Sequence, residues 1–406
     1  MSPAFDVIVF GASGFTGRLV AEYLNNTYGV GGAVAWAMAG RNLAKLAAVR
    51  DGLGIAATLP LIAADAADAP SMDQLVRQAK VVITTVGPYQ RHGEPLITAC
   101  ARAGTDYVDL CGEPLWMAQM IPKLQDRAAA SGARIVFSCG FDSIPFDLGV
   151  VFLQDEMQRR FGAPATRVRC RVRVMKGTMS GGTAASALAT FERMAAEPGL
   201  ASTMADPFAL TPGFRGPAQP EGDSAQYDEV AEGWTGPFVM ATINTKNVHR
   251  TNALRGHPWG RDFVYDERML TGTGPHGAQR ARVLARNAKL QNLLLGLGPA
   301  RALIRRFALP QPGQGPDRAA REAGRYELLF IGQTADGRSL RAVVKGDRDP
   351  GYGSTSKLIA ESALCLVQEV DRSATPGGVW TPGAAMGLAA VRRLQARAGL
   401  SFEIEG

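Results

Sequence analysis

The chain has 406 residues, 46% of them hydrophobic, which is enough for two or three domain cores and excludes a disordered protein. Its net charge of +7 does not indicate a nucleic-acid partner, because residues 268–316 contain eight basic and no acidic side chains and account for the whole excess. The five cysteines and four histidines lack metal-ligand spacings and no uncharged apolar run reaches the roughly 18 residues of a membrane span, so we expect reduced thiols, no metal and a cytoplasmic protein.

Strands and helices alternate through the first 150 residues. Strands are predicted at 5–10, 33–39, 58–64, 81–86, 107–110 and 134–138, and helices at 18–28, 43–49, 73–79, 94–102 and 116–130. Such alternation predicts an α/β fold with a Rossmann-type, doubly wound parallel sheet and helices on both faces. We therefore expect residues 1–150 to form a nucleotide-binding domain.

The pattern changes to that of an α+β domain with a mostly antiparallel sheet over residues 151–350. Residues 166–175 alternate arginine with Val or Cys, which predicts a strand whose arginines face solvent; a nucleic-acid surface is the less favoured interpretation. Further strands are predicted at 238–248, 326–331 and 340–344, loops at 206–237 and 308–317, and helices at 355–370 and 383–398.

A glycine-rich loop separates the first predicted strand from the first predicted helix. Its G-x-x-G-x-x-G spacing removes side chains where a backbone must approach a pyrophosphate, whose charge is met by free N–H groups at the helix start. An ordinary strand-to-helix turn is the alternative. The predicted nucleotide-binding residues of this loop are Gly11, Ser13, Gly14, Phe15, Thr16 and Gly17.

Two further segments bear on the coenzyme. No acidic residue lies between Glu22 and Asp51 to bind a ribose diol, and Arg41 follows the second strand, so NADP is favoured over NAD; alternatively Arg41 begins a helix. Gly87 and Pro88 follow the fourth strand, at the sheet edge where ligands bind, and are predicted to lie beside the nicotinamide unless they form a structural turn. A short-chain dehydrogenase mechanism is excluded, because none of the eight tyrosines is followed four positions later by lysine.

Motifs along nearly the whole chain resemble one family. The chain resembles the saccharopine dehydrogenase-like oxidoreductases and, within them, the trans-acting enoyl reductases. This resemblance implies an NADP-binding first domain, a mixed second domain and a C-terminal helical segment, residues 351–406, that returns to the first. It also implies reduction of a double bond in a lipid-like acyl chain, on a carrier protein or CoA, during glycolipid biosynthesis. The motifs are 7–17, 39–41, 87–89, 140–147, 180–183, 347–352 and 378–382.

Enoyl reduction needs a hydride, donors for the developing enolate oxygen and an acid for the α-carbon. Tyr89 is a candidate proton donor, although its ring can instead serve packing. Asp142 and Ser143 follow a strand and open a helix, so they are predicted either to relay a proton or to cap that helix. Residues 180–183 precede a helix whose N–H groups can hold an oxyanion or form a capped loop.

The basic segment is amphipathic over residues 279–307. It is predicted to meet an acidic acyl carrier or the anionic inner face of the plasma membrane, or else to cover the second domain. A homodimer is also expected. Two other functions stay open at this point: a saccharopine dehydrogenase-like amino-acid oxidoreductase, and a sensor or scaffold that binds NADP without turnover.

Overall fold

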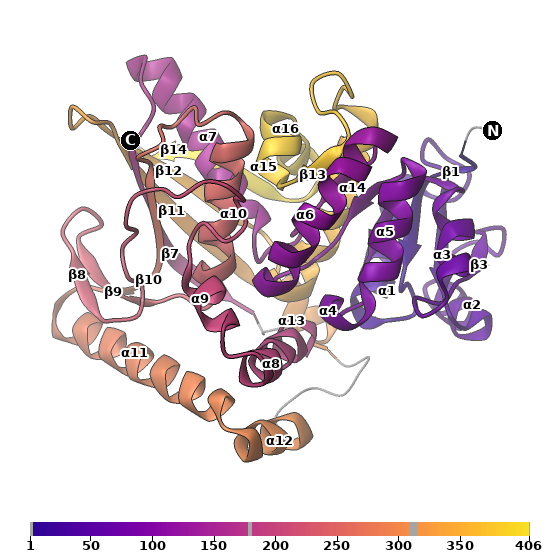
Figure 1. Cartoon of the computed structure of the whole chain (residues 1–406), viewed down its shortest axis with the longest axis horizontal. Coiled ribbons are helices and arrows are strands. Elements are labelled where there is room, and N and C mark those ends of the chain that lie inside the picture. The colour runs from indigo at the N-terminus through magenta and orange to yellow at the C-terminus, as the bar shows by residue number, and fades with distance from the viewer. Residues whose placement is uncertain (1–2, 178–180, 308–314, 406) are drawn as a thin grey trace.

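The computed structural model describes residues 3–177, 181–307 and 315–405, and contains two seven-stranded sheets that stand side by side (Figure 1). The first sheet has the order β13-β6-β5-β4-β1-β2-β3 and is entirely parallel. Its strands are β1 (Phe5–Phe10), β2 (Trp36–Gly40), β3 (Leu61–Ala63), β4 (Ala79–Thr84), β5 (Asp106–Val108), β6 (Arg134–Val136) and β13 (Gly378–Trp380).

Helices cover both faces of this sheet, because its central strands carry apolar side chains on both sides. Those from the first 131 residues are α1 (Phe15–Tyr28), α2 (Leu43–Gly52), α3 (Ala69–Val76), α4 (Tyr89–His92), α5 (Glu94–Ala103) and α6 (Pro114–Ser131). The Rossmann-type prediction is confirmed, and the predicted elements differ from the observed ones mainly at their ends.

The second sheet has the order β14-β12-β11-β7-β10-β9-β8 and is antiparallel except for the β7–β10 pair. Its strands are β7 (Arg167–Lys176), β8 (Gln226–Asp228), β9 (Gly233–Pro237), β10 (Val264–Gly272), β11 (Arg325–Gln333), β12 (Ser339–Gly346) and β14 (Leu400–Glu405). The mostly antiparallel sheet and the β11–β12 hairpin are confirmed. The predicted loop at 206–237 contains two of these strands, and residues 308–314 of the other predicted loop lie outside the described residues.

The remaining helices join or flank the two sheets (Figure 1). They are α7 (Ile144–Phe161), α8 (Gly181–Ala196), α9 (Leu200–Ala205), α10 (Ala241–Leu254), α11 (Gly274–Gly296), α12 (Gly298–Phe307), α13 (Arg318–Glu322), the π-helix η1 (Pro350–Ser354), α14 (Thr355–Gln368), α15 (Pro382–Ala385) and α16 (Gly387–Arg397). None of the helices in the described ranges is long and apolar enough to cross a bilayer.

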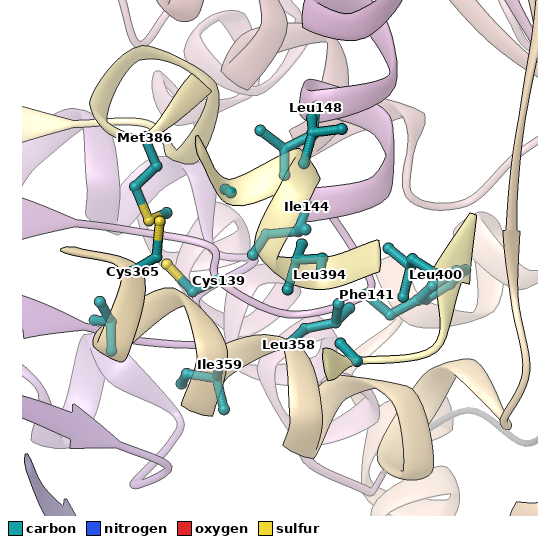
Figure 2. Packing of buried hydrophobic residues seen from close by; sticks show 14 of the residues in the cluster. Cys139, Phe141, Ile144, Leu148, Leu358, Ile359, Cys365, Met386, Leu394 and Leu400 are labelled. Atoms are coloured by element: carbon teal, nitrogen blue, oxygen red, sulfur yellow. The ribbon is translucent and has the colours of Figure 1, made fainter. Parts of the chain in front are cut away.

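One hydrophobic core continues from the first sheet into the second. Phe141, Ile144 and Leu148, at the start of α7, pack with Leu358 of α14 and Leu394 of α16 (Figure 2). The same cluster includes side chains from β1 and β4 and from β11 and β12. The two sheets are therefore joined by packed side chains rather than by a flexible linker.

Two predictions about the second sheet are wrong. Residues 238–248 were expected to form a strand, but residues 241–254 form the helix α10, whose polar side chains are buried by tertiary contacts that a local pattern does not show. The arginines of β7 were expected in solvent, yet Arg171 is 1% exposed because Asp228 and Asp266 pair with it. Arg167 also pairs with Asp266, and Arg173 pairs with Glu405 at 2.5 Å.

Candidate functional site

The glycine-rich loop turns sharply between β1 and α1. Gly11 has φ +87°, and a Cβ at this position would lie 2.7 Å from Val86 Cγ2. A Cβ on Gly17 would lie 2.3 Å from the Gly11 carbonyl oxygen. Both positions therefore require glycine: the first for its left-handed backbone and the second for the close contact of α1 with the loop.

The start of α1 is suited to an anion. Its N-cap residue, Gly14, makes no side-chain hydrogen bond to the helix, and the first turn carries no acidic side chain. The N–H groups of Phe15, Thr16 and Gly17 consequently point out of the helix end without an intrahelical acceptor. The ring of Phe15 packs edge-on against Tyr352 with centroids 4.7 Å apart, so this residue offers a ligand its backbone rather than its side chain.

Arg41 follows β2 at the carboxyl edge of the first sheet. Its side chain is exposed and makes no hydrogen bond or ion pair with any described residue. A free guanidinium beside the nucleotide loop fits a 2′-phosphate and offers nothing to a bare ribose diol. Together, the glycine loop, the start of α1 and Arg41 fit the phosphates of NADP.

A buried carboxylate holds the loop after β4. Glu113 is 1% exposed and accepts hydrogen bonds from the backbone N–H groups of Tyr89 at 2.8 Å and Gln90 at 2.9 Å, and from the Ser186 hydroxyl at 2.7 Å. These contacts fix the segment that contains Gly87 and Pro88. Sequence reasoning missed Glu113, because Tyr89 and Gln90 lie 24 and 23 positions away and Ser186 lies 73 positions away.

Tyr89 lies at the base of this loop. Its hydroxyl donates to the Thr84 carbonyl at 3.2 Å and accepts from the Leu110 N–H at 3.0 Å. Burial raises the pKa of Tyr89 well above its ordinary value. Because the proton is engaged by a carbonyl, the geometry favours a structural contribution, and the predicted role of Tyr89 as proton donor stays untested.

A single cavity of about 1770 Å³ connects the nucleotide loop with the second sheet. Its wall includes Thr16, Gly87 and Pro88 from the first sheet's edge, Asp142 and Ser143, and residues of α8, α10 and α11. Pockets for one small ligand usually occupy about 300–1,000 Å³. The cavity therefore has room for the end of a dinucleotide and for a second molecule.

Asp142 and Ser143 lie in this wall, immediately before α7. Asp142 is half-buried, and burial raises the pKa of its carboxyl to about 6, opposed by a hydrogen bond from the Thr183 hydroxyl at 3.2 Å. Ser143 is the N-cap position of α7 but makes no side-chain cap; its hydroxyl donates instead to Asn244 Oδ1 at 3.0 Å. Neither residue therefore serves as a simple helix cap.

The amide N–H groups of residues 180–183 were predicted to hold an oxyanion or to form a capped loop before a helix, and α8 in fact begins at Gly181. Ser180 lies outside the described residues, and the N–H of Gly181 donates to the Tyr352 hydroxyl at 2.9 Å. Gly182 and Thr183 line the cavity. An oxyanion role stays a prediction for these two residues.

Helix α10 contributes polar groups that sequence reasoning missed. Asn244 Nδ2 donates to Glu267 Oε2 at 3.0 Å, and the Tyr265 hydroxyl donates to Glu267 Oε1 at 2.7 Å. Burial raises the pKa of the Glu267 carboxyl to about 8. Lys246 is 2% exposed, and its Nζ donates to the Met204 carbonyl at 2.8 Å. No local motif marks these residues, since helix and strand bring them together.

Comparisons with known proteins agree with this geometry. Residues 7–136 match the family model described as the saccharopine dehydrogenase NADP binding domain. A Mycobacterium tuberculosis protein, provisionally named a trans-acting enoyl reductase, is 40% identical over 98% of this chain and 97% of its own length. The trans-acting enoyl reductase of Mycobacterium ulcerans is 36% identical over 96% and 95%, respectively. The chain belongs to the trans-acting enoyl reductase family.

The solved structures support the fold of this trans-acting enoyl reductase family member. Saccharopine dehydrogenase from Saccharomyces cerevisiae superposes with a TM-score of 0.56 at 12% identity, covering 99% of this chain and 100% of the yeast chain. The resemblance predicted from the sequence motifs is confirmed, and so is NADP as the coenzyme. The protein is an NADP-dependent oxidoreductase.

Proposed function

We propose that this protein uses NADPH to reduce a carbon–carbon double bond in a lipid-like acyl thioester. The observation that carries the proposal is the shared cavity, in which the nucleotide loop, Asp142 and a path lined by apolar side chains such as Phe191 and Phe238 open into one space. Relatives that align over nearly the full chain are named enoyl reductases. A long acyl chain fits such a path better than a small amino acid does.

The coenzyme supplies the hydride for this reduction, and the protein supplies the proton. When bound, NADPH supplies a hydride to the β-carbon of the enoyl group. The α-carbon then takes a proton from the Asp142 carboxyl, and the carboxylate that remains is reprotonated from solvent through the cavity. A pKa near 6 suits this step, because a useful acid titrates close to the working pH.

The test of this step is Asp142→Asn. The variant removes the proton but keeps the shape, so kcat for an enoyl thioester should fall about 100-fold while the Kd for NADPH stays unchanged. In the wild type, kcat should decline as pH rises through about 6, and the variant should lose that decline. The matched control is Asp155→Asn, on the exposed side of α7, which should behave as wild type.

Two results would contradict the proposal. Full activity of Asp142→Asn would remove this residue from the reaction. Tight NADPH binding without turnover of any enoyl thioester would favour the sensor or scaffold, and NADPH oxidation with a keto acid and an amine would favour the amino-acid oxidoreductase.

We further propose that helices α11 and α12 rest on an anionic lipid surface. Leu290, Leu293, Leu297 and Leu303 are each more than half exposed, and Arg286 lies on the solvent side of α11. The opposite side of α11 lines the cavity through residues such as Leu295. An exposed apolar stripe with basic flanks favours lipid over an acidic carrier, which would need the charges but not the leucines.

Vesicle flotation tests this surface. Leu290→Ser with Leu293→Ser should abolish binding to phosphatidylglycerol vesicles, and Arg286→Gln should weaken it mainly at low salt. Leu43→Ser, which changes an exposed apolar residue at the start of α2, is the control. Undiminished binding by the leucine variant, or binding to an acidic carrier alone, would overturn the lipid assignment. Homodimer formation stays a prediction.

A further inference from the structure

Lys246 is buried, although lysine side chains usually reach the solvent. Its side chain is almost fully buried, yet it lines the cavity rather than the core. Its ammonium has three donors, and the Met204 carbonyl accepts from it at 2.8 Å. No carboxylate among the described residues lies within ion-pair distance of Nζ; Asp206 acts on it from farther away.

Burying a charged ammonium without a counterion costs free energy. Burial lowers the pKa of Lys246 to about 8, opposed by Asp206, so the side chain is still mostly charged at neutral pH. The neighbouring buried side chain, His249, offers no anion, because burial and Lys246 itself favour its neutral form. A buried ammonium without a counterion is therefore available to an anionic ligand.

Thr242 lies one helical turn before Lys246, on the same side of α10. Its side chain is exposed, lines the cavity and makes no hydrogen bond with any described residue. Just before the helix, the Cε atom of Met240 lies 3.8 Å from the Cβ position of Gly112, which precedes Glu113 and lines the same cavity. Lys246 is six residues further on, which places it about 9 Å along the helix from that point.

Resting on the proposed reduction of an acyl thioester, we propose that Lys246 and Thr242 form a subsite for a phosphate ester on the arm that carries the acyl chain. The ammonium supplies charge and two free donors, and the threonine hydroxyl supplies a third. This subsite is distinct from the glycine loop and Arg41, which are predicted to hold the coenzyme's phosphates. Free CoA and the phosphopantetheine arm of a carrier protein both bear such an ester.

The experiment compares two enoyl thioesters that differ in one group. With the wild type, the 4′-phosphopantetheine thioester should have a KM about tenfold below that of the pantetheine thioester, the effect expected of a charged hydrogen bond. Lys246→Met should abolish this difference, and Lys246→Arg should keep most of it. Lys123→Met, which removes an exposed lysine from α6, should leave the difference intact.

A binding measurement separates this subsite from the proposed reaction. Saturated phosphopantetheine and pantetheine thioesters can be titrated calorimetrically in the presence of NADP, so the subsite is tested even if no enoyl substrate turns over. The CoA and carrier-protein thioesters, compared in the same way, identify which source the site prefers. Equal affinity of the wild type for the two saturated thioesters, or an equal loss of both in Lys246→Met, would overturn the proposal.

A folding defect would not produce the expected result. Methionine has nearly the length of lysine and carries no charge, so Lys246→Met should unfold at the same or a higher temperature than the wild type. Unchanged or raised stability together with lost phosphate discrimination supports a ligand role. A lowered unfolding temperature with discrimination retained would instead make Lys246 a structural residue and refute the subsite.

Discussion

Arg171 and Lys246 are two buried cations that lie outside the first sheet, and their surroundings differ. Arg171 on β7 donates to Asp228 at 2.6 Å and pairs with Asp266 at 2.9 Å, so its charge is neutralised within the fold. Lys246 on α10 faces a cavity and meets one backbone carbonyl. A buried charge that is fully paired belongs to the architecture, whereas one left partly unpaired beside a cavity is available to a ligand.

The largest expected effect is the loss of folding stability in the variant Arg171→Met. Removing the guanidinium leaves Asp228 without its ion pair and Asp266 with Arg167 alone, so the free energy of unfolding should fall by about 3–5 kcal/mol. Urea unfolding followed by circular dichroism measures this. Lys246→Met, tested in parallel, should lose far less. If the two variants lost the same free energy of unfolding, the two cations would contribute equally to the fold and the comparison would be wrong.

The next largest effect is a pH-dependent change in stability at Glu267. This buried carboxyl avoids the cost of burying a charge by remaining protonated. Its pKa of about 8 lies above that of an unfolded glutamate, so the unfolded chain releases this proton first and stability falls as pH rises from about 4.5 to 8. Glu267→Gln cannot ionise. Its stability relative to the wild type should therefore rise by about 3.5 kcal/mol between pH 5 and pH 8.

Urea unfolding at the two pH values provides that measurement. The exposed Glu403→Gln is the control, because Lys345 lowers rather than raises the pKa of Glu403 and no gain toward alkaline pH is expected. A pH-independent difference between Glu267→Gln and the wild type would mean that Glu267 is ionised in the folded protein.

The smallest expected effect is on coenzyme affinity and concerns Arg41, an exposed cation without an ion-pair partner among the described residues. Arg41→Gln should weaken NADPH binding about tenfold, or about 1.4 kcal/mol, and leave NADH binding and the free energy of unfolding unchanged. Fluorescence titration with both coenzymes measures the preference. Arg50→Gln, on the same helix-bearing segment but paired with Asp51, is the control. An unaltered preference would assign the 2′-phosphate to another residue.

The sequence was informative where function depends on short-range geometry. Gly11 and Gly17 are needed because of atoms a few residues away or in the adjacent strand, so their spacing within a strand–loop–helix pattern predicted the nucleotide site. The position of Arg41 after β2 was predicted for the same reason, since the end of β2 follows from its apolar run, and its coenzyme role stays a prediction.

The sequence was misleading where burial depends on distant partners. The polar residues of α10 are buried because α7, α9 and β10 contact them, and nothing within the helix indicates this. In the same way, the alternating arginines of β7 match a solvent-facing strand until Asp228 and Asp266 are placed beside them. Glu113 was not predicted because its partners are backbone N–H groups of the loop after β4, which is distant in the sequence.

The last thirty residues contribute one strand to each sheet: β13 pairs with β6 in the first, and β14 pairs with β12 in the second. Between them, α16 packs on α7 within the shared core. A hinge that opened the two halves would have to disrupt that core and break at least one of the two edge pairings. We therefore expect the two halves to keep a constant separation while substrate enters the cavity and product leaves it.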